Sequence, residues 1–220
     1  MKCIVKNENI WDAKYQKNNQ LWSSRADAKL LQYFDLIELG DVLDFGIGEG
    51  RNSLPFAMNG FNIDGVDISG TAIHRCEENF NSRKLSANLT LSDVRDFAIE
   101  KKKYTLITAA NVLNFFCQAD INELIEKIKL GIREVGVIYF SVFSTLEPTY
   151  KFLKENKREF EKNTFYCDEK NVYTHFFTKE ELLNYFSDFE LISCCEGLEF
   201  DNEKDNPHYH GIIEFLVRKK

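Results

Sequence analysis

The sequence predicts an α/β fold: a mostly parallel sheet, covered by helices on both faces, that ends in an antiparallel hairpin. Short apolar runs alternate with amphipathic stretches as far as residue 145, which is typical of repeated strand–helix–strand units. The last two apolar runs are joined by the short polar turn DNEKDNP, which fits a hairpin better than a crossover. With 220 residues and 44% hydrophobic content, the chain is expected to form a single domain over 1–220.

The expected elements follow one another in a regular order. Residues 22–37 place apolar side chains on one helical face, with Ser23 or Ser24 available as the N-cap. Further helices are expected over 70–83 and 119–130, between the strands. The strands themselves are expected in the apolar runs DVLDF, FNIDGVDI, ANLTL, YTLITAA and VGVIYFSVF.

The pattern changes after residue 145. Residues 149–163 form an amphipathic stretch that is rich in Lys, Glu and aromatic side chains. Thr178 and Glu181 then frame a capping box at the start of the helix TKEELLNYF. The two closing strands are expected in FELISCCEGLEF and HGIIEFLVRK.

Composition narrows the class of protein. The formal net charge of -7 argues against sequence-independent nucleic-acid binding, which needs clustered Lys and Arg. No segment approaches about eighteen uncharged apolar residues, so we expect a cytoplasmic protein that does not bind a membrane. The six cysteines are scattered without a CxxC pair, so we expect reduced thiols and neither a zinc site nor a disulfide framework.

The most informative stretch is VLDFGIGEGRNSLPFAMNG. If the first strand ends at Asp44, the turn containing Gly46, Gly48 and Gly50 lies at the carboxyl edge of the sheet, where open α/β folds bind ligands. Glycine lacks the Cβ that would keep a ligand away from the backbone. The second strand ends at Asp67, whose carboxylate is expected to accept hydrogen bonds from both hydroxyls of a ribose. Asp44 either assists this site or hydrogen-bonds the turn itself.

The glycine spacing separates two classes of nucleotide-binding protein. A GxGxxG dinucleotide fingerprint that began at Gly46 would need a third glycine where Arg51 stands. The pattern DxGxGxG instead resembles that of class I S-adenosylmethionine-dependent methyltransferases. In that family, the acid matching Asp67 binds ribose, and the segment matching Asp93-Val94 contacts adenine. The stretch YTLITAANVLNFF matches the family's fourth strand and following turn, which line the methionine end and the substrate opening.

The resemblance implies the Rossmann-like, seven-stranded methyltransferase fold, with S-adenosylmethionine as the cofactor. RNSL, at 51–54, and the later stretch FTKEELLNYFSDFEL resemble the tellurite-resistance (TehB-like) group of small methyltransferases. Ile47 replaces this group's usual cysteine and NPHYHGII replaces its C-terminal signature, so the likeness carries over the cofactor site rather than the acceptor. The residues expected to bind the cofactor are Asp44, Gly46, Gly48, Gly50, Arg51, Asn52, Asp67, Ile68, Asp93, Val94 and Asn111.

Several singled-out residues also have ordinary structural explanations. Asp93 can be a solvent-facing acid, and Asn111 or Asn114 can be a turn residue. The catalytic residues are not identified, but His208 and His210 share one face of a strand and are candidates for steering or deprotonating an acceptor. No Cys, Asp or Glu pattern beside them completes a closed zinc site, so no metal is expected.

By analogy with the fold, residues 1–21 and 145–175 are expected to form a lid or substrate cap, with Trp11, Tyr15 and the nearby Trp22 over the site. A sulfonium methyl group is already activated, so a base is needed only when the nucleophile arrives protonated. We therefore expect a small-molecule acceptor, such as a thiol or a chalcogen oxyanion.

Two other functions stay open at this point. An NAD(P)-binding oxidoreductase shares the nucleotide-binding fold but is disfavoured by the glycine spacing and the closing hairpin. A non-catalytic module that binds S-adenosylmethionine would need the same pocket without a catalytic group. The expected partner is a small-molecule methyl acceptor, without nucleic acid, and the oligomeric state is left open.

Overall fold

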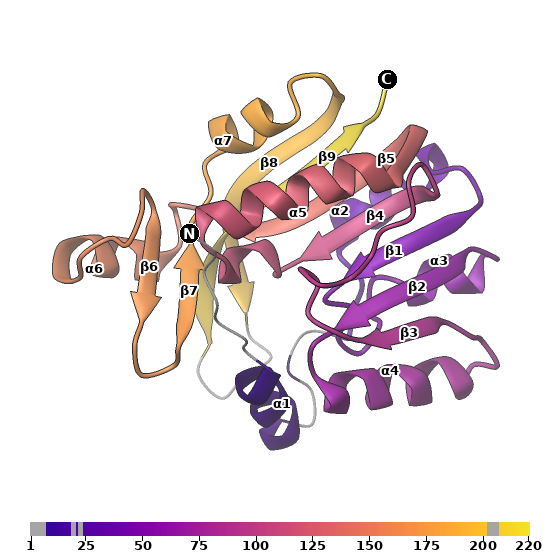
Figure 1. Ribbon diagram of the computed structural model, residues 1–220, viewed down its shortest axis with the longest axis horizontal. Helices are drawn as coiled ribbons and strands as arrows, with labels where there is room; N and C mark the ends of the chain where they lie inside the picture. Colours follow the sequence, from indigo (N-terminus) through magenta and orange to yellow (C-terminus); the bar gives the residue numbers. More distant parts are fainter. Residues whose placement is uncertain (1–7, 19–20, 22–23, 202–206) are drawn as a thin grey trace.

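The computed structural model describes residues 8–18, 21, 24–201 and 207–220 (Figure 1). A seven-stranded sheet with the order β3-β2-β1-β4-β5-β9-β8 forms its centre. A separate two-stranded sheet, β6-β7, extends to one side of it (Figure 1). The strands are β1 Asp41–Phe45, β2 Asn62–Asp67, β3 Asn88–Leu91, β4 Tyr104–Ala110, β5 Ile132–Phe143, β6 Thr164–Cys167, β7 Val172–His175, β8 Glu190–Asp201 and β9 His208–Arg218.

Strand directions follow the sequence prediction. The pairs β1·β2, β1·β4, β2·β3 and β4·β5 are parallel, whereas β9 pairs antiparallel with both β5 and β8. Only six residues separate β8 from β9 in the sequence, which permits an antiparallel pair, and the helical connections permit the parallel pairs. The predicted mostly parallel sheet with a closing antiparallel hairpin is therefore confirmed.

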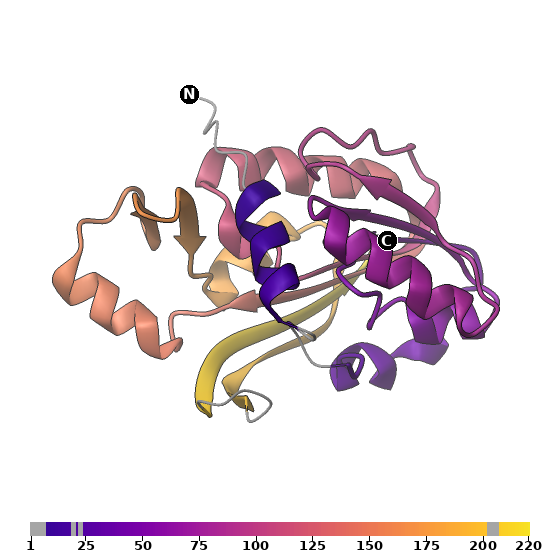
Figure 2. The ribbon, with the colours of Figure 1, turned by 90° about the horizontal axis from the view of Figure 1, so that it is seen from below.

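Helices cover both faces of this sheet, as Figure 2 shows. One core cluster contains buried residues of α5 and α7, and the other contains buried residues of α2, α3 and α4. Strand residues alternate between the two clusters: Ile138 and Phe140 belong to the first, and Val137 and Tyr139 to the second. The helices are α1 Glu8–Lys17, α2 Ala28–Gln32, α3 Leu54–Met58, α4 Gly70–Asn81, α5 Gln118–Gly131, α6 Pro148–Asn156 and α7 Lys179–Tyr185.

The helix expected over 22–37 is much shorter than its apolar pattern suggested. It is limited to α2 and a 3-10 turn at Phe34–Leu36, and its N-cap is Asp27. Neither Ser23 nor Trp22 lies among the described residues, and Ser24 precedes the helix in a bend. Arg51 and Asn52 hydrogen-bond Asp27, so the chain before α2 is held by side chains far away in the sequence. Local periodicity cannot detect such a constraint.

The region after β5 also differs from the expected amphipathic stretch over 149–163. Helix α6 ends at Asn156, and the hairpin of β6 and β7 follows. Asn163 and Asn171 adopt φ values of 56° and 49°, a backbone conformation that asparagine tolerates better than most residues. Aromatic contacts join the hairpin to α6, since the rings of Tyr150 and Phe176 lie 5.2 Å apart.

The predicted capping box at α7 is confirmed on its Thr178 side. The Oγ1 of Thr178 accepts a hydrogen bond from the backbone N–H of Glu181 at 3.2 Å. The carboxylate of Glu181 instead lies 3.0 Å from Nε2 of the buried His175, whose Nδ1 lies 2.7 Å from Oγ1 of Thr164. Glu181 on α7 thus contacts His175 on β7, which in turn contacts Thr164 on β6.

Two further sequence expectations concern cysteines and membranes. Cys76, Cys167, Cys194 and Cys195 are free, but Cys117 is disulfide-bonded, so the expectation of reduced thiols is wrong at that position. Among the described residues, no helix is long and apolar enough to span a membrane.

Replacing Thr178 with Ala tests the cap. We expect Thr178→Ala to lower the free energy of unfolding by about 1 kcal/mol, because one N-terminal N–H of α7 loses its acceptor. Urea denaturation of this variant and of Ser82→Ala, an exposed hydroxyl at a helix C-terminus, measures the difference. Equal stabilities of the two variants would contradict a stabilising role for the cap.

Candidate functional site

The glycine turn follows β1 at the carboxyl edge of the sheet. Gly46, Gly48 and Gly50 have φ values of 65°, 56° and 85°, which glycine adopts without steric cost. A Cβ on Gly46 would lie 2.3 Å from Cγ2 of Val112, and one on Gly48 would lie 2.7 Å from the hydroxyl oxygen of Tyr15. The turn is thus closely approached by side chains from outside β1, and larger residues do not fit.

The carboxylate of Asp67 anchors this turn. Its Oδ2 accepts a hydrogen bond from the backbone N–H of Gly48, and its Oδ1 accepts one from that of Ser69, both at 2.9 Å. Burial raises the pKa of Asp67 to about 6, although the backbone donors oppose this shift. A carboxylate has about four acceptor positions, so each oxygen can accept a further bond from a ligand hydroxyl.

Asp44 has a different set of partners. Its two oxygens accept hydrogen bonds from the hydroxyls of Ser53 and Thr108, each at 2.6 Å. Burial raises the pKa of Asp44 to about 6. Asp44 therefore ties β1 to β4 and to the start of α3 through side chains, rather than by hydrogen-bonding the turn's backbone.

Arg51 and Asn52 are also directed toward the protein. Nη1 of Arg51 lies 2.5 Å from Oδ1 of Asp27, and Asn52 exchanges two hydrogen bonds with the backbone and the carboxylate of Asp27. Both residues line a cavity beside the glycine turn. Their contacts show that they hold the segment before α2 against the turn.

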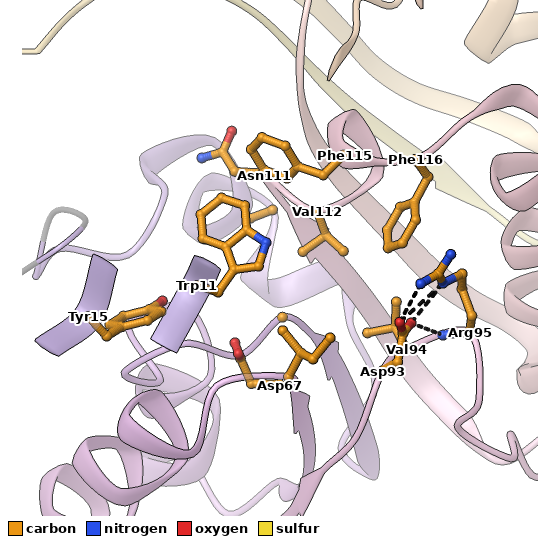
Figure 3. Close-up of a pocket in the computed structure, with 13 residues that line it drawn as sticks. Trp11, Tyr15, Asp67, Asp93, Val94, Arg95, Asn111, Val112, Phe115 and Phe116 are labelled. Atoms are coloured by element: carbon orange, nitrogen blue, oxygen red, sulfur yellow. Dashed lines mark hydrogen bonds and ion pairs between the residues drawn. The ribbon is translucent and has the colours of Figure 1, made fainter. Parts of the chain in front are cut away.

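The strand ends next to Asp67 form the other side of the site. Ile68, Asp93 and Val94 line a cavity together with Arg95 and Phe116. The carboxylate of Asp93 forms an ion pair with Arg95 at 2.6 Å, drawn as dashed lines in Figure 3. Asp93 is thus a buried, paired acid, and the expectation of an ordinary solvent-facing acid is wrong.

Helix α1 closes the cavity from outside the sheet. Trp11 lies beside Asn111, Val112 and Phe115 (Figure 3), and its ring centroid is 4.6 Å from that of Phe115. Oδ1 of Asp12 anchors the helix by accepting hydrogen bonds from the Ser69 hydroxyl and the Thr71 backbone N–H, both at 2.8 Å. The side chain of Ser69 in turn caps α4. These contacts attach α1 to the start of α4.

Two cavities meet at this edge. Both are lined by Tyr15, Gly46, Ala110 and Asn111. Asn111 adopts a φ of 58°, and its buried Oδ1 has no hydrogen-bond partner among the described residues. Because an unpaired buried polar atom is costly, this oxygen is suited to a ligand donor or cation.

These features fit a nucleoside-bearing cofactor. Asp67 retains acceptor positions for hydroxyls, and the oxygen of Asn111 has no hydrogen-bond partner in the part of the chain that the structure describes.

Of the residues predicted to bind the cofactor, all except Gly50 line one of the two cavities. A Cβ on Gly50 would lie 3.0 Å from Sγ of Cys76 and 2.8 Å from a ring carbon of Phe80, so this glycine permits packing against α4. Sequence reasoning missed the cavity-lining residue Arg95, whose position next to Asp93 and Val94 was the available signal. Val112, Phe115 and Phe116 belong to the stretch that the family resemblance placed along the substrate opening, and they line the cavity.

The second predicted cover segment, 145–175, forms α6 and the β6–β7 hairpin beside the sheet. The described residues that line the two cavities do not come from this segment. Asn114 is fully buried, and its Oδ1 accepts a hydrogen bond from the backbone N–H of Phe143 at 2.8 Å. Asn114 therefore joins the turn after β4 to the end of β5.

His208 and His210 lie at the start of β9. They are not among the described residues that line the two cavities. The ring of Phe143 lies between this region and the site, with centroids 5.6 Å from His210 and 6.1 Å from Phe115. A direct catalytic role for either histidine stays a prediction.

Comparison with known proteins agrees with this geometry. Residues 42–136 match a family model described as a methyltransferase domain. Over 125 residues, the chain is 29% identical to carboxy-S-adenosyl-L-methionine synthase from Aliivibrio fischeri, covering 54% of this chain and 48% of that protein. The chain therefore spans about half the length of the curated relatives it matches.

Solved structures share the fold at low sequence identity. TehB from Haemophilus influenzae matches with a TM-score of 0.71 and 20% identity, covering 95% of this chain and 66% of that chain. The 1,6-didemethyltoxoflavin-N1-methyltransferase of Burkholderia thailandensis, solved with S-adenosylhomocysteine bound, matches with a TM-score of 0.67 and 15% identity. That match covers 97% of this chain and 87% of the other.

The fold and the family match agree on one class of domain. Residues 42–136 match the methyltransferase-domain model, and the whole sheet has the class I, Rossmann-like methyltransferase fold. S-adenosylmethionine is the cofactor of this class of domain. Within the class, the likeness to TehB extends along nearly the whole chain at the level of the fold.

Replacing Asp67 with Asn tests the predicted ribose contact. We expect Asp67→Asn to weaken S-adenosylmethionine binding roughly 10- to 100-fold, because a charged acceptor for a hydroxyl is lost. Calorimetry measures the affinity, and Asp64→Asn on the same strand is the control, because Asp64 bonds Lys103 instead. Equal affinities of the two variants for S-adenosylmethionine would show that Asp67 does not bind the cofactor.

The raised pKa of Asp67 predicts a pH dependence of binding. As the pH falls through about 6, Asp67 in the folded protein takes up a proton and loses acceptor capacity, so affinity for S-adenosylmethionine should fall. The stability of the unliganded protein should change in the opposite sense. Between about pH 6 and 3.8, the ordinary pKa of an aspartate, Asp44 and Asp67 bind more protons in the folded than in the unfolded protein, so their contribution to stability rises as the pH falls.

Calorimetric titrations between pH 7.5 and pH 5, with wild type and Asp67→Asn, separate the effect of Asp67 from other titrations. The affinity of wild type should fall more steeply than that of the variant. Parallel pH profiles would show that protonation of Asp67 does not govern binding.

Proposed function

We propose that this chain transfers the methyl group of S-adenosylmethionine to a small-molecule acceptor. The observation that carries the proposal is the junction of the two cavities at Asn111, where a buried oxygen has no hydrogen-bond partner among the residues that the structure describes. This junction lies at the end of β4, between the glycine turn and Trp11. A reacting group held there would have cofactor-binding residues on one side and an aromatic surface on the other.

The residues around the junction have distinct roles in this proposal. Asp67 would hold the ribose hydroxyls, while Ile68 and Val94 would contact the adenine from the neighbouring strand ends. Asp93 would face the same base with its carboxylate held by Arg95. The glycine turn would border the ligand, because Gly46 and Gly48 line the cavities and Asp67 holds the turn at Gly48.

S-adenosylmethionine supplies a methyl group already activated by the sulfonium charge. The task of the protein is to orient the acceptor toward that methyl group and to exclude water. Orientation alone is worth roughly 7–11 kcal/mol in well-aligned reactions. Trp11 and Phe115 form the wall that would orient the acceptor, and the attachment of α1 through Asp12 would keep this wall closed.

A thiol or a chalcogen oxyanion is the acceptor class that we favour. The residues lining the Trp11 side of the cavity are mainly apolar or aromatic: Trp11, Val112, Phe115 and Phe116. A nucleophile that is already anionic needs no general base. The name of the toxoflavin methyltransferase shows that a protein with this fold acts on a small molecule, which supports the same size class here.

The second candidate, an oxidoreductase that binds NAD(P), receives less support. Arg51 occupies the third glycine position of the dinucleotide fingerprint, and its side chain is bound to Asp27. A non-catalytic binding module would share the cofactor residues and differ only in turnover.

Acceptor-dependent formation of S-adenosylhomocysteine tests the proposal. We expect turnover with at least one member of a panel of small thiols, selenite and tellurite. Trp11→Ala should raise the KM for the acceptor up to ~10-fold, because the loss of a half-buried aromatic contact costs about 1 kcal/mol. Phe152→Ala, an exposed aromatic residue on α6, is the control.

Binding of S-adenosylmethionine without turnover of any acceptor in the panel would favour the non-catalytic module. An equal effect of both substitutions on the KM for the acceptor would show that Trp11 is not part of the acceptor site.

A further inference from the structure

The β8–β9 hairpin brings together three side chains that are suited to metal binding. The pairing of the strands places Asp201 directly opposite His208, and His210 shares a strand face with His208. One ligand atom from each of the three residues lies within 4.8 Å of the other two. Sequence patterns did not indicate this third ligand, because only the strand pairing brings Asp201 to the histidines.

The donor set favours a divalent transition metal. Imidazole nitrogen and carboxylate oxygen are typical ligands of Zn²⁺, and two histidines with one acid are a known three-ligand set. Ligand atoms around a tetrahedral Zn²⁺ lie roughly 3.3 Å apart, so the three groups need to approach by at most about 1.5 Å. The Nε2 of His210 already lies 3.8 Å from Oδ2 of Asp201.

The other ring nitrogen of His210 provides a second, independent observation. Its Nδ1 lies 3.3 Å from Oε2 of Glu147, a carboxylate that is 5% exposed. A metal-binding histidine commonly donates its remote N–H to a carboxylate, which fixes the ring and makes it a stronger ligand. His210 therefore has a carboxylate partner on Nδ1 while its Nε2 faces Asp201.

Close packing holds Glu147 in this place. Oε2 of Glu147 also accepts a hydrogen bond from the backbone N–H of Gly211 at 2.8 Å. A Cβ on Gly211 would lie 2.1 Å from the backbone nitrogen of Glu147, so only glycine allows this approach. The segment after β5 thus lies directly against β9, next to the histidine.

We propose that Asp201, His208 and His210 form a binding site for a divalent transition-metal ion such as Zn²⁺, with Glu147 as a positioning residue for His210. Three protein ligands leave a coordination position for water or an anionic ligand. Phe143 stacks on His210 and contacts Phe115, so the site lies one aromatic layer from the cavity lined by Trp11. The site does not depend on the proposed methyl transfer.

Titration of the untagged full chain with Zn²⁺ and Co²⁺ tests this site. We expect one equivalent of each ion to bind, and bound Co²⁺ to show the visible absorption of a tetrahedral complex, whereas Mg²⁺ does not compete. His208→Ala, His210→Ala and Asp201→Asn should each weaken binding by at least ~10-fold. Glu147→Gln should weaken it by about 10- to 100-fold while leaving the stoichiometry unchanged.

His74→Ala is the matched control, because His74 is an exposed histidine that lies 3.7 Å from the carboxylate of Glu78 on α4. Absence of stoichiometric binding, or equal losses in His74→Ala and His210→Ala, would overturn the proposal. Wild-type affinity in Glu147→Gln would overturn the positioning role. Because the readout is metal binding, it is separate from S-adenosylmethionine binding and turnover.

Discussion

The buried carboxylate of Asp67 is the interaction on which the site depends. It joins the glycine turn at Gly48 to Ser69 at the start of α4, and so links two successive strand–helix units. Asp12 accepts hydrogen bonds from the hydroxyl of the same Ser69 and from the backbone N–H of Thr71, so helix α1 is also attached to the start of α4. Burial opposes ionisation of Asp67, and the two backbone donors offset part of that cost. A ligand hydroxyl that bonds the carboxylate would offset more of it.

The arrangement of polar groups explains why this edge of the sheet is suited to chemistry. Asp44, Asp93 and Asn52 are all satisfied by protein partners, and they hold strands, turn and flanking segments in place. Asn111 differs, because its backbone lies in the left-handed region and its buried oxygen lacks a described partner. Strained and unsatisfied groups persist where the surrounding structure fixes them, often at functional sites. The rigid surroundings and the unsatisfied oxygen together support ligand binding at Asn111.

Sequence patterns predicted the features that local chemistry determines. The central strands, the glycine turn, the acid at Asp67 and the cap at Thr178 all depend on neighbouring residues, and the structure has them where expected. The short α2, the β6–β7 hairpin and the approach of Asp201 to His210 depend on contacts between distant residues, which periodicity does not encode. The same reason explains why Arg95 was missed. Its role follows from the ion pairs that it forms with Asp93 and Asp120 across two elements, rather than from any motif.

The most direct test of the central claim is calorimetric titration of the purified chain with S-adenosylmethionine, S-adenosylhomocysteine and NAD. Our account predicts that both adenosyl ligands bind with a stoichiometry of one and that NAD does not bind, because Arg51 replaces the third fingerprint glycine and Asp67 lies beside the glycine turn. Binding of NAD without binding of either adenosyl ligand would contradict the account.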